Sequence, residues 1–257
     1  MSALHRLPVL LAIATLGSCG GGSESPLAQP AFQTNVVPRF DRIGGERIGG
    51  AGPTVVVLAT NINDTLNDDL VNQGVVPRLV TAGYQVLTLD LPCHGADAAS
   101  STVDPLYCWS VRIHDGDNAI FSRFCAELGN VLTSLGLNEV GIVGISRGGY
   151  MAITCAAYEP RITAVALIMP VTDLDVLSEF QQYPASESLF GVQQYVPVLS
   201  HLPVLVRIGK SDERVRTDLA VAFAQQVHAQ LQLLDTSGHS APEDGSTIRF
   251  LETYLPP

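Results

Sequence analysis

Short apolar runs alternate with amphipathic segments along most of the chain. The apolar runs are typical of buried strands, and they predict strands over residues 54–59, 85–91, 140–145, 164–169, 204–208 and 231–234. The amphipathic segments predict helices over residues 66–82, 118–135, 147–158, 219–229 and 247–254. Strands that alternate with helices in this way form a mostly parallel sheet with helices on both faces. The pattern therefore predicts the doubly wound α/β class.

Three segments depart from this alternation. Residues 31–50 are rich in turn-forming glycines and predict a hairpin or two short edge strands. Residues 92–116 predict a long loop, and residues 172–203 separate two strands with mixed polar and aromatic content. Because loops of this length usually form lids or pocket walls, we expect a lid at about 172–203. Its larger apolar residues either contact the substrate or belong to the core beneath the lid, and they are Leu177, Phe180, Tyr183, Leu189, Phe190 and Tyr195.

The first residues of the chain predict an export signal. Arg6 precedes a short apolar run from Val9 to Leu16, and small residues follow. The run is too short to span a bilayer as a mature helix. We therefore expect a signal peptide over 1–19, a Gly/Ser/Pro-rich linker over 20–30 and one α/β domain over 31–257. An unstructured terminus of a cytoplasmic protein is the alternative.

Export also affects the interpretation of the remaining cysteines. Cys93, Cys108, Cys125 and Cys155 are even in number, and an oxidising compartment would let them form two disulfides in any of three pairings. Four buried free thiols are the alternative. None of the spacings matches a zinc or redox motif, so they do not predict a metal site.

Charge narrows the range of partners and cofactors. The formal net charge of −11 repels phosphate backbones, so nucleic acid is not an expected partner. Lys210 is the single lysine, which leaves little room for Schiff-base chemistry. The glycines at 42–50 lack the strand-to-helix setting of a dinucleotide loop, and no cofactor is expected.

Ser146 lies where a predicted strand meets a predicted helix, in Gly144-Ile145-Ser146-Arg147-Gly148. A serine at such a tight turn is strained, and its hydroxyl lies exposed above the sheet. The neighbouring chain comes too close for side chains at the two flanking positions, which glycine fits. The Arg147 amide begins the helix and can donate to a developing oxyanion. The pattern predicts a nucleophile.

A serine nucleophile needs a base and an acid that orients it. His239 follows the last predicted strand in Ser237-Gly238-His239 and is the expected base, whereas His201 lies in the irregular segment and His228 in a helical pattern. Asp212 follows the strand before the histidine strand and is the expected acid. Its rivals are Asp173, Asp175 and Asp235, and capping of the next helix is the alternative role for Asp212.

The chain from about residue 54 to 255 resembles the α/β-hydrolase superfamily in the order of its elements and in its motifs. The segment 144–148 is similar to the nucleophile elbow of that family, 209–215 to its acid loop and 237–239 to its histidine loop. The resemblance implies an α/β-hydrolase fold with Ser146, Asp212 and His239 as a catalytic triad. Residues 90–95 resemble the family's Asp-x-x-x-His-Gly turn, whose histidine (here His94) is structural.

One segment departs from the family. The second oxyanion donor usually lies in a His-Gly-rich loop, but this chain has Ala59-Thr60-Asn61-Ile62 there. Any backbone amide can serve, so we expect Asn61 or Ile62 to donate beside Arg147. Loss of one donor costs about a hundred- to a thousand-fold in rate. The acidic clusters at 61–64 and 114–117 precede helices, where they cap, and they do not predict a metal.

Together these features predict a serine hydrolase that cleaves small-molecule carboxylic esters through an acyl-enzyme on Ser146. A peptidase, amidase or thioesterase with the same triad, and a lyase, perhydrolase or binding protein of the same fold, remain open. Leu16-Gly17-Ser18-Cys19 resembles a bacterial lipobox, in which the cysteine carries a lipid. The expected location is periplasmic or membrane-anchored through Cys19, and plain secretion remains open because Gly17 is unusual there.

Overall fold

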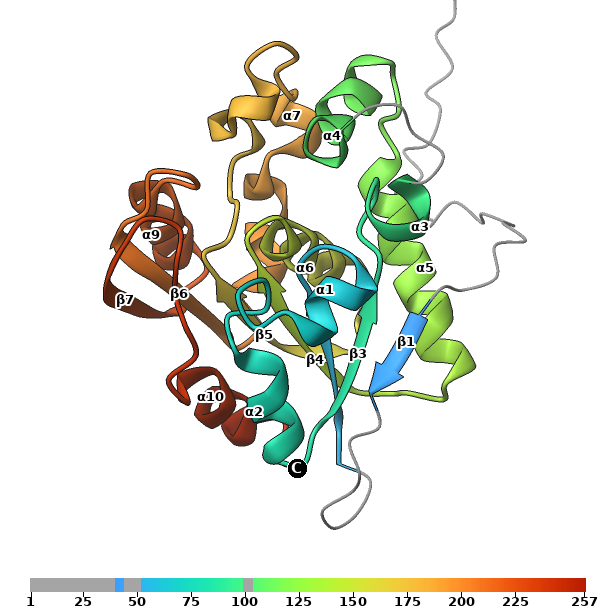
Figure 1. The fold of residues 1–257 in the computed structure, drawn as a ribbon, viewed down its shortest axis with the longest axis vertical. Helices are drawn as coiled ribbons and strands as arrows, with labels where there is room; N and C mark the ends of the chain where they lie inside the picture. Colours follow the sequence, from blue (N-terminus) through green and yellow to red (C-terminus); the bar gives the residue numbers. More distant parts are fainter. Residues whose placement is uncertain (1–39, 44–51, 99–103) are drawn as a thin grey trace, which may run out of the picture. The chain divides into compact units, whose positions relative to one another are not determined.

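A twisted sheet forms the centre of the part of the chain described by the computed structural model, residues 40–43, 52–98 and 104–257 (Figure 1). Its strands lie in the order β1-β3-β2-β4-β5-β6-β7. Strand β1 pairs with β3 in antiparallel orientation, and all other neighbours are parallel. The strands are β1 Phe40–Ile43, β2 Thr54–Leu58, β3 Gln85–Leu89, β4 Val140–Ile145, β5 Ile162–Ile168, β6 Val204–Ser211 and β7 Gln230–Ser237.

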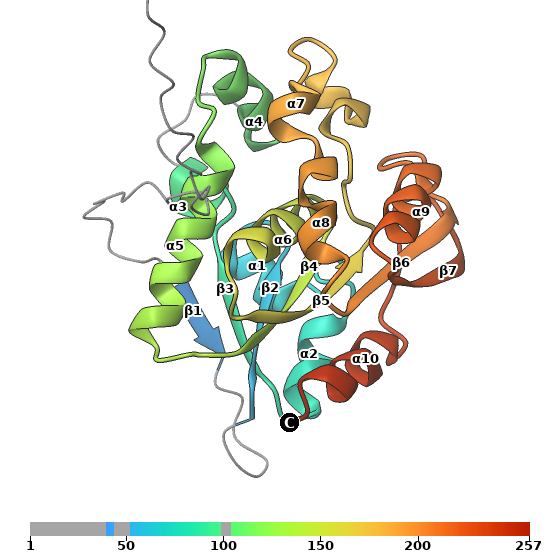
Figure 2. The ribbon, with the colours of Figure 1, turned by 180° about the vertical axis from the view of Figure 1, so that it is seen from behind.

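Helices cover both faces of this sheet, which confirms the predicted α/β-hydrolase fold class (Figures 1 and 2). They are α1 Ile62–Asn67, α2 Val75–Thr81, α3 Gly95–Ala98, α4 Pro105–His114, α5 Ile120–Ser134, α6 Arg147–Tyr158, α7 Glu187–Phe190, α8 Val196–Leu199, α9 Thr217–Gln226 and α10 Ser246–Tyr254. Gly141 and Gly144 of β4 show the two layers, since a Cβ at Gly141 would meet α10 and one at Gly144 would meet α6. Strands β2 and β4 are buried at every position because helices cover them on both sides.

Two sequence predictions about helices were wrong. The helix expected over 66–82 is two helices, α1 and α2, and the Asn61 side chain caps the first by accepting the Asp64 amide. The chain breaks between them because the Asn72 side chain binds the Thr65 carbonyl and the Gly74 amide, and Gly74 takes the left-handed conformation at φ 74°. The long loop expected over 92–116 contains α3 and α4. Elsewhere the predicted elements are present, with ends shifted by a few residues.

Segment 172–203 crosses from β5 to β6 through α7, α8 and three short 3₁₀ helices, η1 Leu174–Val176, η2 Ser178–Phe180 and η3 Val192–Tyr195. In both views α7 lies beside α4, and Tyr183 stacks on His114 of α4 with 4.0 Å between ring centroids (Figures 1 and 2). Four of its six larger apolar residues belong to the core, namely Leu177, Phe180, Phe190 and Tyr195. Leu189 is exposed. That the segment acts as a lid stays a prediction.

Two disulfides join helices to their neighbours. Cys93 in the turn after β3 pairs with Cys108 of α4, and Cys125 of α5 pairs with Cys155 of α6. This is one of the three pairings that the sequence left open.

The predicted signal peptide, the lipid site at Cys19 and the linker over 20–30 lie outside the described residues. Of the segment 31–50, the structure describes β1, a short edge strand. No helix in residues 40–43, 52–98 and 104–257 is long and apolar enough to cross a membrane.

Candidate active site

Ser146 occupies the sharp turn between β4 and α6. Its backbone has φ 54° and ψ −116°, a conformation that non-glycine residues rarely adopt. Close packing holds it there, because a Cβ at Gly148 would lie 1.9 Å from the Leu58 carbonyl oxygen and one at Gly144 would lie 2.5 Å from the Gly148 carbonyl oxygen. Only glycine fits at these two positions, so the strain at Ser146 is imposed by the surrounding chain.

Three loops at the carboxyl edge of the sheet bring the predicted nucleophile, base and acid together. His239 Nε2 lies 2.9 Å from Ser146 Oγ, and His239 Nδ1 lies 2.8 Å from Asp212 Oδ2. The three residues follow β4, β7 and β6, and parallel strands end at the same edge. With Nδ1 donating to Asp212, Nε2 is left to accept the Ser146 proton.

Asp212 is buried and fixed by its own loop. Its Oδ1 accepts hydrogen bonds from the amides of Arg214 and Val215, at 3.0 and 3.2 Å, while its Oδ2 faces His239. The Asp212 amide donates to Thr217 Oγ1, which in turn donates to the Gly209 carbonyl. Bonds on both oxygens fix the orientation of the carboxyl group toward the imidazole.

The rival residues lie elsewhere. Asp173 caps η1 by accepting the Asp175 amide, and Asp175 accepts the Ala185 amide. Asp235 is exposed and forms an ion pair with Lys210. His201 and His228 are exposed as well.

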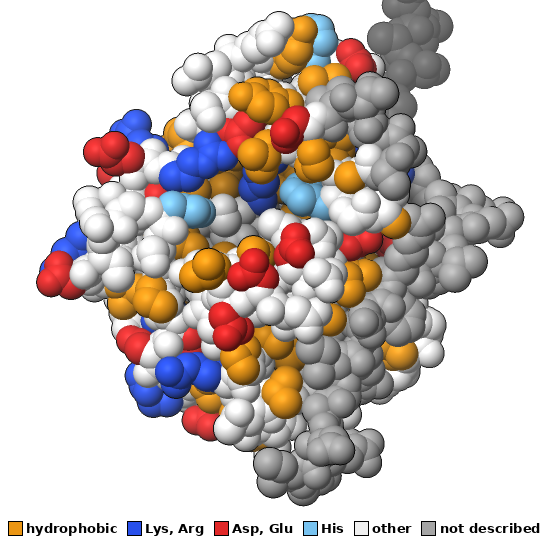
Figure 3. Space-filling view, in the orientation of Figure 1, with side chains coloured by type: hydrophobic (Ala, Val, Ile, Leu, Met, Phe, Trp, Pro, Cys, Tyr) orange, Lys and Arg blue, Asp and Glu red, His pale blue; other side chains and the backbone are white. Residues whose placement is uncertain are grey.

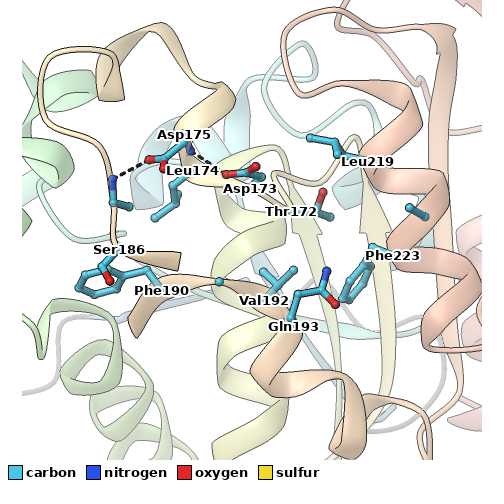
Figure 4. Close-up of a pocket in the computed structure, with 13 residues that line it drawn as sticks. Thr172, Asp173, Leu174, Asp175, Ser186, Phe190, Val192, Gln193, Leu219 and Phe223 are labelled. Atoms are coloured by element: carbon cyan, nitrogen blue, oxygen red, sulfur yellow. Dashed lines mark hydrogen bonds between the residues drawn. The ribbon is translucent and has the colours of Figure 1, made fainter. Parts of the chain in front are cut away.

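Asp173 and Asp175 line a separate cavity of about 210 Å³ between segment 172–193 and α9 (Figure 4). Figure 4 shows their two backbone hydrogen bonds as dashed lines, with Phe190 and Val192 on one side and Leu219 and Phe223 on the other. No member of the Ser146–His239–Asp212 group lines it.

The loop that carries His239 is held by two residues that the sequence did not reveal. Gln73 accepts the Ala241 amide through its side chain at 3.0 Å and the Glu243 amide through its carbonyl at 2.8 Å. Arg207, buried in β6, pairs with the buried Glu243 at 2.7 Å. A lone arginine within an apolar strand pattern was the available signal, because a buried charge needs a partner.

The structure separates the two candidates for the second oxyanion donor. The Ile62 amide donates to Asp90 Oδ1 at 2.8 Å, so this donor is already engaged, which favours the other candidate, Asn61. The Thr60 amide donates to Thr65 Oγ1. Among the described residues, the Asn61 amide donates to no other group. Asn61 and Arg147, the first residue of α6, remain as candidates.

The side chain of Arg147 has a second role that the sequence analysis missed. Arg147 is 5% exposed, and the Cζ atom of its guanidinium lies 5.1 Å from the ring centroid of Trp109. It donates to the Leu106 carbonyl and to Glu179 Oε1, each at 2.8 Å. Burial lowers the pKa of Arg147, and the charge of Glu179 opposes this effect. The available signal in the sequence was an arginine in the first turn of an apolar helix, because a buried guanidinium needs a charged partner.

His94 lies in the turn after β3 and outside the hydrogen-bonded group of Ser146. Its Nδ1 lies 2.9 Å from the Pro92 carbonyl, which also accepts Trp109 Nε1. Burial lowers the pKa of His94, so the neutral ring donates to this carbonyl. Within residues 40–43, 52–98 and 104–257, no cluster of three or more histidine, cysteine, aspartate or glutamate residues could hold a metal ion.

The chain is similar in sequence to one family of known proteins. The sequence profile described as alpha/beta hydrolase fold matches residues 53–194, more than half of the chain. No curated protein matches the chain in sequence.

Solved structures resemble it in fold. An esterase of Pyrococcus furiosus has a TM-score of 0.58 at 18% identity, over 80% of this chain and 83% of its own. Acetyl xylan esterase 1 of Thermoanaerobacterium has a TM-score of 0.55 at 20% identity, over 80% and 76%. A Mycobacterium tuberculosis protein has a TM-score of 0.59 at 15% identity, over 84% and 93%. At these identities the likeness establishes the fold.

Proposed function

Because the chain belongs to the α/β-hydrolase fold family, we propose that it is a serine hydrolase that cleaves carboxylic esters through an acyl-enzyme on Ser146. The observation that carries the proposal is the unbroken hydrogen-bond chain from Ser146 Oγ through His239 to Asp212. Such a chain supplies a nucleophile, a base and an orienting acid in one arrangement. The esterases among the similar folds support the choice of ester substrates.

The first half of the reaction forms the acyl-enzyme. His239 Nε2 takes the Ser146 proton while Oγ attacks the ester carbonyl carbon, and the carbonyl oxygen becomes an oxyanion. The amides of Arg147 and Asn61 donate to this oxyanion. The protonated imidazole, stabilised by Asp212, then gives its proton to the departing alcohol as the carbon–oxygen bond breaks.

The second half regenerates the enzyme with the same groups. His239 takes a proton from water, the hydroxide oxygen attacks the acyl carbon, and the same two amides hold the second oxyanion. The proton returns to Ser146 Oγ as the acid product leaves. The sharp turn places Oγ at the site in both halves of the reaction, and the close approach of the chain at Gly144 and Gly148 supports that turn.

A chain-length series of p-nitrophenyl esters tests the proposal, with Ser146→Ala as the matched variant. We expect the wild type to release p-nitrophenol and the variant to lose about a millionfold in kcat. A fluorophosphonate probe should label the wild type at Ser146 and leave the variant unlabelled. Wild-type protein that is folded but takes no label, or equal rates in both proteins, would contradict the proposal. A p-nitroanilide and a thioester in the same series distinguish amide and thioester substrates.

We also propose that the chain is exported and carries a lipid on Cys19. The apolar run before Cys19 supports this, and the two disulfides fit an oxidising compartment. Metabolic labelling of bacterial cells with a radioactive fatty acid should label the wild type but not Cys19→Ser. Label in neither protein would contradict the lipid, and retention in the cytoplasm would contradict export.

A further inference from the structure

Glu179 is a buried carboxylate in η2 that contacts both sides of the proposed site. It is 3% exposed, and its neighbours Leu177 and Phe180 are buried beside it, so the segment holds it in place. Its Oε1 accepts hydrogen bonds from Arg147 and from Arg214 Nη2, and its Oε2 accepts one from Arg214 Nη1 at 2.8 Å. One carboxylate therefore joins Arg147, at the start of α6, to Arg214, in the loop after β6.

The two arginines lie at backbone positions that matter for the proposed reaction. Arg147 follows Ser146 directly, and its amide is the expected oxyanion donor. The Arg214 amide donates to Asp212 Oδ1 at 3.0 Å, and Asp212 Oδ2 binds His239. Glu179 therefore binds the side chain of the residue that carries the expected oxyanion donor, and it also binds the side chain of Arg214, whose amide holds the acid.

The charges favour this arrangement. Burial raises the pKa of Glu179, but hydrogen bonds and charge from Arg214 and Arg147 outweigh it and bring the pKa to about 2. The carboxylate is therefore ionised at neutral pH, when it balances two guanidinium groups. Histidine and basic side chains gather in the middle of one face of the molecule, with hydrophobic and acidic ones around them (Figure 3). Without the Glu179 charge, the buried Arg147 and the partly exposed Arg214 would repel each other.

We propose that Glu179 is a positioning residue, which holds the nucleophile elbow and the acid loop in register through Arg147 and Arg214. The proposal rests on the proposed hydrolase function. Glu179 touches none of the reacting groups itself, and it acts through the backbone positions of the two arginines. A displacement of about 1 Å at a catalytic group can cost roughly a hundredfold in rate. The effect should therefore appear in kcat rather than in KM.

Glu179→Gln tests this, because it keeps the shape and removes the charge. Glu159→Gln is the matched control, since Glu159 is also buried and pairs with Arg161 at 2.6 Å, after the far end of α6. Both are assayed with p-nitrophenyl acetate well below their melting temperatures. We expect Glu179→Gln to lower kcat and the rate of fluorophosphonate labelling about 10- to 100-fold, with KM within about twofold. Glu159→Gln should keep the wild-type kcat.

Two results would overturn the proposal: wild-type kcat and labelling in Glu179→Gln, or an equal loss in Glu159→Gln. If Glu179→Gln does not fold, Arg214→Gln and Arg214→Lys replace it, because this side chain is 34% exposed. The first should lower kcat and the second restore part of it, and wild-type kcat in Arg214→Gln would again overturn the proposal. The wild type, measured against Ser146→Ala, separates failure of the proposed hydrolase function from failure of this inference. A wild type without esterase activity or label refutes the hydrolase and this inference together, whereas an active wild type matched by Glu179→Gln refutes only the inference.

Discussion

The role of Asp212 depends on one hydrogen bond to His239 Nδ1. Asp212→Asn keeps the size of the side chain but removes its negative charge. The amide would present either a donor or a neutral acceptor to His239, so the imidazole would no longer be held in the tautomer that leaves Nε2 free to accept a proton. We expect kcat to fall about ten-thousandfold, as when the acid of such a triad is made neutral. Steady-state kinetics would measure it. Asp173→Asn and Asp235→Asn are the matched controls and should keep kcat near that of the wild type, and a larger loss in either would move the acid to that residue.

The glycine after the elbow residue Arg147 is fixed by contact rather than by backbone freedom. A Cβ on Gly148 would lie 1.9 Å from the backbone of Leu58, which cannot move without shifting β2. Gly148→Ala should therefore lower the free energy of unfolding by about 1–3 kcal/mol, as overpacked sites do. It should also lower kcat, since Ser146 moves with the turn. Urea unfolding and ester kinetics on one preparation measure both, and an unchanged urea midpoint would show that the contact is relieved elsewhere.

At the scale of elements, the disulfide Cys125–Cys155 joins α5 to the helix that begins after Ser146. Its partners are 30 residues apart, so loop closure predicts a loss of roughly 3–4 kcal/mol when both are changed to alanine. The double variant should unfold at lower urea concentration, and a reductant should lower the midpoint of the wild type more than that of the variant. Free thiols at Cys125 and Cys155 in the unreduced wild type would contradict the pairing.

The strands and the chemistry at their ends could be predicted because both depend on local signals. Gly144-x-Ser146-x-Gly148 after an apolar run predicts a turn from sequence alone, and His239 and Asp212 follow strands in a fixed order. The break between α1 and α2 could not, because it depends on the side chain of Asn72 binding groups on both sides of it. The engagement of the Ile62 amide by Asp90 joins residues 28 apart, which no periodicity reveals.

The buried ion pairs show the same limit. A charged residue in an apolar pattern signals that a partner exists, but it does not say which one. Glu179 and Arg147 are 32 residues apart, and Arg207 and Glu243 are 36 apart. Only the arrangement of the sheet brings the members of these pairs together.

At the scale of the whole molecule, we expect carboxylates that are paired with arginine to set the response to acid. The pKa values of Glu179 and Asp244 are held at about 2, because hydrogen bonds and arginine charge outweigh burial. A carboxyl whose pKa is depressed by folding stabilises the native state above its unfolded pKa, near 4, and this contribution is lost as pH falls toward 2. Glu179 alone should contribute on the order of 3 kcal/mol. Stability measured by urea unfolding should therefore fall steeply between about pH 4.5 and pH 2.

Glu179→Gln tests which group causes the loss of stability between about pH 4.5 and pH 2, because the variant lacks the Glu179 carboxyl. Its stability should start lower at pH 7 and fall less between pH 4.5 and pH 2 than that of the wild type. Parallel pH curves for the two proteins would show that Glu179 is not the group that titrates.

The proposed base lies 93 residues after the nucleophile, on the loop that follows the edge strand β7. A chain made only to the end of α6 contains Ser146 but not His239, the imidazole that lies within hydrogen-bond distance of it. The proposed activity therefore requires β7 to pair with β6, because this pairing brings His239 to Ser146. Incomplete chains lack the proposed base, so under this proposal Ser146 becomes reactive only once almost all of the domain is present.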